Sequence, residues 1–228
     1  DRNGGCQKCD QDSSSATWTS TGLIGQTKCA GEEDEMPTER ALLSRLYDQC
    51  GGVGWHNQMN WNSDDSHCTW YGITCDDSSS VKDISLGANQ LIGNFPTEMY
   101  RLPKLEKLSV YSNSVDVSFE GIENAANLRN LVLDETNLAS LEGIGKARTL
   151  EELTVRFNGL SGRIPEDIKG LVSLNALTIS DNDFTGEIPY WISDLPSLTT
   201  FLAANNKLTG PVYDFADMSF LTFLDLSG

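Results

Sequence analysis

The sequence predicts an α/β repeat solenoid, a right-handed coil of short units whose parallel strands form one concave sheet. Two observations support this fold class. A unit of 22 to 24 residues recurs from Val81 to the end of the 228-residue chain, whereas all six cysteines lie in the first third. We therefore expect three regions: a Cys-containing polar extension at 1–36, a cap at 37–80 and the repeats at 81–228.

The repeat reads L-x-x-L-x-L-x-x-N-x-L-x-G-x-I-P in its fullest copies. Leucines at positions one, four and six bracket a short strand whose alternate side chains point to one side. One unit cannot bury these leucines alone, but stacked units share a continuous core. The pattern is that of a leucine-rich repeat, with six complete copies and a truncated seventh, which begin at Val81, Leu105, Leu128, Leu150, Leu174, Leu198 and Leu221.

Position nine of the unit is an Asn in five copies. A carboxamide both donates and accepts hydrogen bonds, so it can satisfy the backbone of a turn that is buried inside the coil. We interpret this row as a structural ladder and not as a ligand site, with Thr136 replacing the Asn in copy three. Its members are Asn89, Asn113, Asn158, Asn182 and Asn206.

The second half of the unit carries a resemblance. SGRIP at 161–165 and TGEIP at 185–189 look like the plant-type leucine-rich repeat of receptor-kinase ectodomains and polygalacturonase-inhibiting proteins. This resemblance implies a second short strand on the flank of the solenoid. Copies two and three lack G-x-I-P. They instead share a similar segment, Ser118–Leu128 in copy two and Ser140–Leu150 in copy three. We therefore expect the second sheet to be interrupted at both of these copies.

The cap is predicted to begin with a helix. Thr38 can act as its N-cap, the apolar residues from Leu42 to Cys50 share one helical face, and Gly51 follows the last turn. The next segment resembles the N-terminal cap of extracellular plant-type repeat proteins, W-N…C-x-W-x-G-[IV]-x-C. That resemblance implies a disulfide between Cys68 and Cys75. It also places two tryptophans beneath the first repeat, Trp61 and Trp70.

Four further cysteines accompany the extension and the cap helix: Cys6, Cys9, Cys29 and Cys50. We expect them to pair among themselves, and three pairings remain open. A zinc site built on Cys6-x2-Cys9 is the alternative, but it needs reduced thiolates. An even cysteine count indicates an oxidising compartment, and the chain begins at Asp1 without Met, so we expect a secreted or cell-surface protein after removal of a leader. No cofactor or metal is expected.

The net charge of −17 argues against nucleic-acid and anionic-membrane partners. No apolar run approaches the roughly 18 residues of a membrane span. Only two histidines occur, His56 and His67, and no nucleophile elbow, zinc-protease motif or phosphate loop is present. We therefore expect a protein without enzymatic activity. A hydrolase with two carboxylates is the less favoured alternative, since acids are abundant.

Positions five, seven and eight of each copy are expected to face the concave surface, where most residues are small or polar. Copies two to four differ, because aromatic residues and an Arg among small residues are typical of an interface. The candidate ligand-binding residues are Tyr111, Val132, Asp134, Glu135, Arg156 and Phe157. The alternative is that Asp134 and Arg156 merely neutralise one another. Tyr190 and Trp191 form a second candidate, for which core packing of Trp191 is the alternative.

The predicted function is non-catalytic extracellular recognition of a protein or peptide through the concave face. A secreted inhibitor of a cell-wall-degrading enzyme and a structural or adhesive extracellular protein are the alternatives. Copy seven stops after its strand, so Leu221, Leu224 and Leu226 are expected to form an exposed apolar edge. We expect further repeats or a partner to cover this edge.

Overall fold

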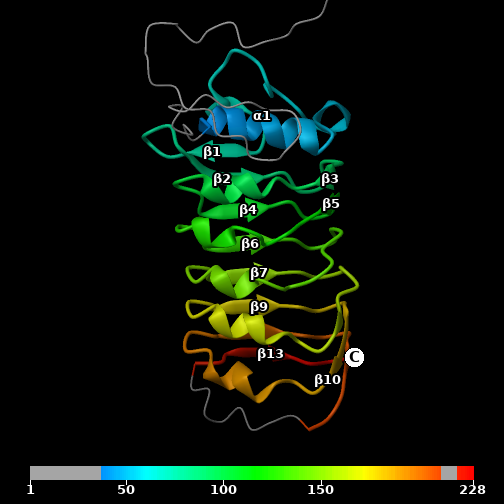
Figure 1. Ribbon diagram of the computed structural model, residues 1–228. Helices are drawn as coiled ribbons and strands as arrows, with labels where there is room; N and C mark the ends of the chain where they lie inside the picture. The colour runs from blue at the N-terminus through cyan, green and yellow to red at the C-terminus, as the bar shows by residue number, and fades with distance from the viewer. Residues whose placement is uncertain (1–36, 212–219) are drawn as a thin grey trace, which may run out of the picture. The chain divides into compact units, whose positions relative to one another are not determined.

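The computed structural model describes residues 37–211 and 220–228. Within it, Thr38–Gly228 form one compact unit of stacked coils (Figure 1). Its main sheet has eight strands in the order β1-β2-β4-β6-β7-β9-β11-β13. The strands are β1 (Ile73–Cys75), β2 (Val81–Ser85), β4 (Lys107–Ser109), β6 (Asn130–Val132), β7 (Glu152–Thr154), β9 (Ala176–Thr178), β11 (Thr200–Leu202) and β13 (Phe223–Asp225). One parallel strand falls in each of the seven copies, which confirms the leucine-rich-repeat solenoid.

The parallel strands are paired in register, so equivalent residues of successive copies stand in columns. The position-four column runs from Ile84 to Leu224, and its members from Ile84 to Phe201 are fully buried. Each unit thus covers the apolar side of its neighbour, as the repeat spacing predicts.

A second set of short strands lies on the flank. β3 (Ile92–Asn94) pairs with β5 (Ser114–Asp116), and β10 (Asp183–Gly186) lies between β8 (Ser161–Gly162) and β12 (Lys207–Leu208). The break therefore falls at copy three alone, and the expectation that copy two also lacks this strand is wrong. Copy two forms β5 without G-x-I-P because Val115 and Val117 alternate inward and are buried.

Short 3-10 helices lie between the flanking segment of one copy and the main-sheet strand of the next copy along the chain. Those of copies two and three have three residues, and those of copies one, four and five have five. Their bounds are η3 (Thr97–Arg101), η4 (Ile122–Asn124), η5 (Ile144–Lys146), η6 (Glu166–Gly170) and η7 (Tyr190–Asp194).

The cap begins with α1 (Glu39–Gln49), where the Thr38 side chain accepts a hydrogen bond from the Ala41 amide. Two 3-10 turns follow, η1 (Gly52–Gly54) and η2 (His67–Thr69). Cys68 and Cys75 form the expected disulfide. Strand β1 then pairs antiparallel with β2, a contact that the repeat pattern does not predict. Trp61 and Trp70 are buried with ring centroids 5.0 Å apart, so they pack within the cap core.

Cys50 lies in the core of the cap. Its thiol is fully buried at the end of α1, and its Sγ donates to the Asn94 carbonyl at 3.6 Å. Burial raises the pKa of this thiol to about 12. In this position the side chain packs as a small apolar residue. The three cysteines that we expect as its candidate partners, Cys6, Cys9 and Cys29, lie outside the described residues, so the pairing stays a prediction.

Copy seven partly matches its expected apolar edge. Leu224 is 41% exposed, but Leu221 and Leu226 are partly buried against the core. Phe220 and Phe223 are exposed instead, at 66% and 67%. Across 37–211 and 220–228, no helix has the length and apolar character that a membrane crossing requires.

Candidate ligand-binding surface

Hydrogen bonds from the position-nine side chains link each coil to the one before it, behind the concave surface. The Asn182 carboxamide accepts from the amides of Asn158 and Leu160 at 3.1 and 3.0 Å. It also donates to the carbonyls of three residues, Val155, Ile179 and Ser180. Asn89, Asn113, Asn158 and Asn206 make comparable contacts. These side chains are thus bonded to backbone groups of their own and neighbouring coils, as a structural ladder requires.

Position eight of each complete copy has a backbone conformation that the sequence does not reveal. Its six residues have φ between 50° and 59°, in the left-handed region that costs a non-glycine residue about 1–2 kcal/mol. They are Ala88, Ser112, Glu135, Phe157, Asp181 and Asn205. Each donates its amide to a carbonyl of the next coil, as Glu135 does to Arg156 at 2.7 Å. These hydrogen bonds between coils hold the same turn in each complete copy. This turn fixes the direction of the position-eight side chains.

Two exposed aromatic side chains mark the concave surface of copies two and four. Tyr111 is 44% exposed and Phe157 is 54% exposed. The Tyr111 ring occupies the space that a side chain at Gly87 would need, so it rests on the backbone of copy one. Val132, on the strand between the two aromatic copies, is half-buried. Tyr111 follows β4, Val132 lies on β6 and Phe157 follows β7. These three strands are paired side by side, so the three residues belong to successive coils.

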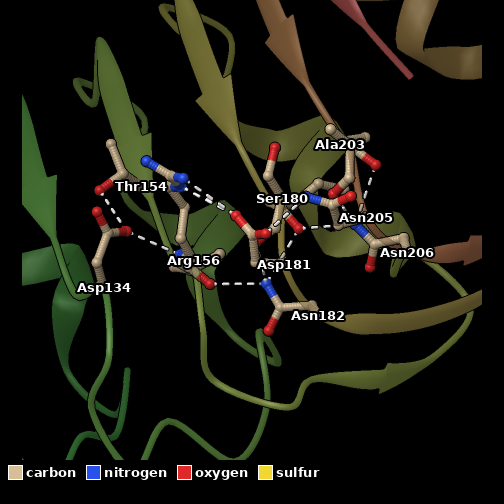
Figure 2. Close-up of polar contacts among 12 residues, drawn as sticks. Asp134, Thr154, Arg156, Ser180, Asp181, Asn182, Ala203, Asn205 and Asn206 are labelled. Carbon is tan, nitrogen blue, oxygen red and sulfur yellow. Dashed lines mark hydrogen bonds and ion pairs between the residues drawn. The ribbon is translucent and has the colours of Figure 1, made fainter. Parts of the chain in front are cut away.

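Arg156 pairs with a residue that sequence reasoning missed. Its Nη2 lies 3.1 Å from Asp181 Oδ2 and its Nε lies 3.4 Å away (Figure 2). The guanidinium carbon lies 5.0 Å from the centroid of the Phe157 ring, a cation–π contact. Asn205 donates to the other Asp181 oxygen at 2.8 Å. The sequence does place Asp181 at position eight of copy five, next to the copy that contains Arg156. The direction of its side chain, however, depends on the left-handed backbone at that position.

Asp134 does not neutralise the Arg156 side chain. Its Oδ1 accepts from the Thr154 hydroxyl at 2.8 Å and from the Arg156 backbone amide at 2.7 Å (Figure 2). Glu135 Oε2 accepts from the Ser112 hydroxyl at 2.6 Å. The side chains that hold both carboxylates are thus neutral donors.

The other candidates lie elsewhere. Trp191 is 2% exposed and belongs to the core, whereas Tyr190 is 67% exposed on η7. His56 is exposed in the cap, and His67 Nε2 lies 3.5 Å from a Glu39 carboxylate oxygen. His67 also lies close to the sulfurs of Cys68 and Cys75, but those sulfurs are joined to each other and cannot act as thiolate ligands.

The stacked strands, the Asn ladder and the disulfide-linked cap define a leucine-rich-repeat protein. The leucine rich repeat N-terminal domain model matches residues 56–76, and the Leucine Rich Repeat model matches 149–171 and 173–195. Among curated proteins, receptor-like protein kinase 5 of Arabidopsis thaliana is 40% identical over 57 residues, which are 25% of this chain and 6% of that protein. MDIS1-interacting receptor like kinase 1 of the same plant is 28% identical over 121 residues, 50% of this chain and 12% of that protein. The chain thus spans a small part of the length of the relatives it matches.

Solved structures of plant proteins have the same fold as this chain. The Arabidopsis receptor kinase HAESA ectodomain, in complex with the IDA peptide hormone ligand, has a TM-score of 0.60 and 27% identity, covering 81% of this chain and 36% of that one. A plant ice-binding protein has a TM-score of 0.66 and 26% identity, covering 78% of this chain and 58% of that one. The chain therefore has the leucine-rich-repeat fold, and it is similar over parts of its length to plant receptor-like kinases and to the ectodomain of a plant receptor kinase.

Proposed function

We propose that the concave surface of copies two to four binds a protein or peptide ligand, without catalysis, outside the cell. One observation carries the proposal. Tyr111 and Phe157 remain 44% and 54% exposed on a face where neighbouring positions such as Ser109 and Thr178 are small. Exposed aromatic residues beside an Arg are the composition of an interface hot spot.

The similar proteins support a receptor-like role outside the cell. They include plant receptor-like kinases, and the HAESA ectodomain was solved with a peptide hormone. We extend the receptor-like role to this chain as a proposal, with Tyr111, Val132, Asp134, Glu135, Arg156 and Phe157 as its ligand-binding residues.

The test compares three immobilised proteins: wild type, Tyr111→Ala with Phe157→Ala, and the control Tyr190→Ala, which removes an exposed aromatic residue on η7. Proteins and peptides of the native extracellular fraction are captured and identified by mass spectrometry, and the dissociation constant of each captured partner is measured. We expect the double variant to bind at least about tenfold more weakly, since central aromatic residues each contribute about 1–2 kcal/mol. Its melting temperature should stay within about 2 °C of wild type, because surface substitutions change stability little.

Equal binding by the wild type and the double variant contradicts the proposal. If the partner is a cell-wall-degrading enzyme that loses activity on binding, the protein is an inhibitor and not a receptor-like module. If the only partner is the chain itself, the structural or adhesive alternative takes its place.

A further inference from the structure

We propose that Asp181 of copy five is a positioning residue of the ligand-binding surface. It holds the Arg156 guanidinium against the Phe157 ring, and the ring in that position meets the ligand. This inference rests on the proposed function and deepens it, because it adds a residue that acts on binding without touching the ligand.

The Asp181 carboxylate is held from two directions. Its Oδ2 lies 3.1 Å from Arg156 Nη2 and 3.4 Å from Arg156 Nε (Figure 2). Its Oδ1 accepts from the side chain of Asn205 at 2.8 Å. Both oxygens are therefore engaged, one with copy four and the other with copy six.

This carboxylate is also better shielded from water than those of the other Lys and Arg ion pairs. The Asp181 side chain is 15% exposed, whereas the acidic side chains of the other such pairs within 37–211 and 220–228 are 35–76% exposed. An exposed pair is weak because water screens it and both side chains stay mobile, whereas shielding strengthens the attraction. Asp181 can thus fix the guanidinium of an Arg side chain that is itself 44% exposed.

The main chain at Asp181 sets the direction of the carboxylate. Its φ is 59°, its amide donates to the Ala204 carbonyl at 2.9 Å, and its carbonyl accepts from the Phe157 amide at 3.1 Å. The backbone is thus bonded to the coil on each side, so the side chain starts from a fixed point. Figure 2 shows the carboxylate directed toward Arg156.

The guanidinium in turn supports the Phe157 ring. Its carbon lies 5.0 Å from the ring centroid. Within the part of the chain that the structure describes, Phe157 has no second aromatic or cation–π contact. The Tyr111 ring differs, because it occupies the space left by the missing side chain at Gly87. The order of the Phe157 ring therefore depends on Arg156, and through Arg156 on Asp181.

An ordered ring favours binding because the ligand does not have to immobilise it. Ordering side chains at an interface uses part of the free energy of association, and an Arg side chain has much rotamer freedom to lose. Asp181 orders Arg156 before the ligand arrives. From the usual cost of immobilising one such side chain, we expect this contact to tighten binding about two- to tenfold.

The test uses Asp181→Asn in the full chain. The variant keeps the size of the side chain, removes its charge, and leaves one oxygen for the two donors from Arg156 and Asn205. Asp183→Asn is the matched control, since it makes the same substitution in the same copy but removes an ion pair of the flank, to Lys207 at 2.6 Å.

The first measurement needs no partner. In the ¹⁵N spectrum of the labelled protein, the Arg156 Nε–H signal is assigned by its loss in Arg156→Ala. We expect this proton to exchange with water faster in Asp181→Asn than in wild type, because its acceptor has gone, and to exchange as in wild type in Asp183→Asn.

The second measurement is the dissociation constant of the partner identified by mass spectrometry in the capture described above. We expect Asp181→Asn to bind about two- to tenfold more weakly and Asp183→Asn to bind as wild type does. In an Arg156→Ala background, Asp181→Asn should cause no further loss, whereas a merely structural role would persist there. The melting temperatures of the two Asn variants should agree within about 2 °C, since each loses one ion pair.

Three results overturn the inference. They are equal binding by Asp181→Asn and Asp183→Asn, an Arg156 Nε–H proton whose exchange Asp181→Asn leaves unchanged, and an undiminished effect of Asp181→Asn in the Arg156→Ala background. The last result would show that Asp181 acts on the partner without Arg156.

The two proposals fail in different ways. If the captured partner loses binding to Tyr111→Ala with Phe157→Ala but binds Asp181→Asn as it binds wild type, the binding surface stands and the positioning role is wrong. If the partner binds both variants as it binds wild type, the surface itself is wrong.

Discussion

Replacing Asn182 with Ala removes the side chain that joins copies four and five behind the concave surface. The carboxamide makes five hydrogen bonds to backbone groups and the residue is 7% exposed. Ala keeps the backbone of the turn but offers no donor or acceptor. The variant therefore tests whether the ladder holds the repeats together.

The magnitude depends on which backbone groups lose their partner. The Ile179 carbonyl keeps a second donor, Asn206 Nδ2 at 3.0 Å. The amides of Asn158 and Leu160 have no such second partner among the contacts of this turn. A buried amide without a partner costs about 1–3 kcal/mol, so we expect the free energy of unfolding to fall by about 3–4 kcal/mol. That is a large part of the roughly 5–15 kcal/mol that stabilises a typical domain.

The assay is equilibrium unfolding in urea, followed by tryptophan fluorescence, with hydrogen exchange of the native protein in parallel. Exchange should quicken at Leu160, whose amide has lost its acceptor. Asn137→Ala is the matched control, because this Asn is exposed and only its backbone amide is bonded, to Val115. It should cost no more than about 0.5 kcal/mol. A loss below about 1 kcal/mol for Asn182→Ala, or equal losses for the two variants, would show that the position-nine hydrogen bonds do not hold the repeats together.

Two further predictions concern titratable groups. Folding lowers the pKa of Glu98, chiefly through a backbone hydrogen bond and further through Arg45, whose Nη1 lies 2.7 Å away. The stability from this group is present above the unfolded pKa near 4.3 and is lost as pH falls through the lower folded pKa. The urea midpoint of Glu98→Gln should thus fall less than that of wild type between about pH 6 and pH 3, and parallel curves would count against this. Burial and a pKa of about 12 should keep Cys50 unmodified by iodoacetamide at neutral pH in the native protein, whereas peptide mapping should find it alkylated in urea.

The solenoid could be predicted from the sequence because each position of the unit is repeated. The leucines of successive copies share one environment, so their periodicity indicates the strands without any knowledge of the turns. The Asn row could be assigned a structural role on the same ground. The Cys68–Cys75 bond came from the resemblance of the cap and not from the spacing alone.

Features that occur once could not be predicted in the same way. The partner of Arg156 depends on the left-handed backbone at position eight, which turns Asp181 toward the neighbouring coil. Strand β5 forms because two buried valines replace the usual motif. The burial of Cys50 at the end of α1 depends on how the cap packs, which a count of cysteines does not reveal.

We propose that the ligand binds to the concave surface of copies two to four. Hydrogen exchange of the full chain, with and without the captured partner, locates the bound surface residue by residue. We expect the partner to protect the amides of 107–112, 130–135 and 152–157 while those of η7, at Tyr190–Asp194, exchange as before. Protection confined to η7, to the flanking strands or to the cap would contradict the claim.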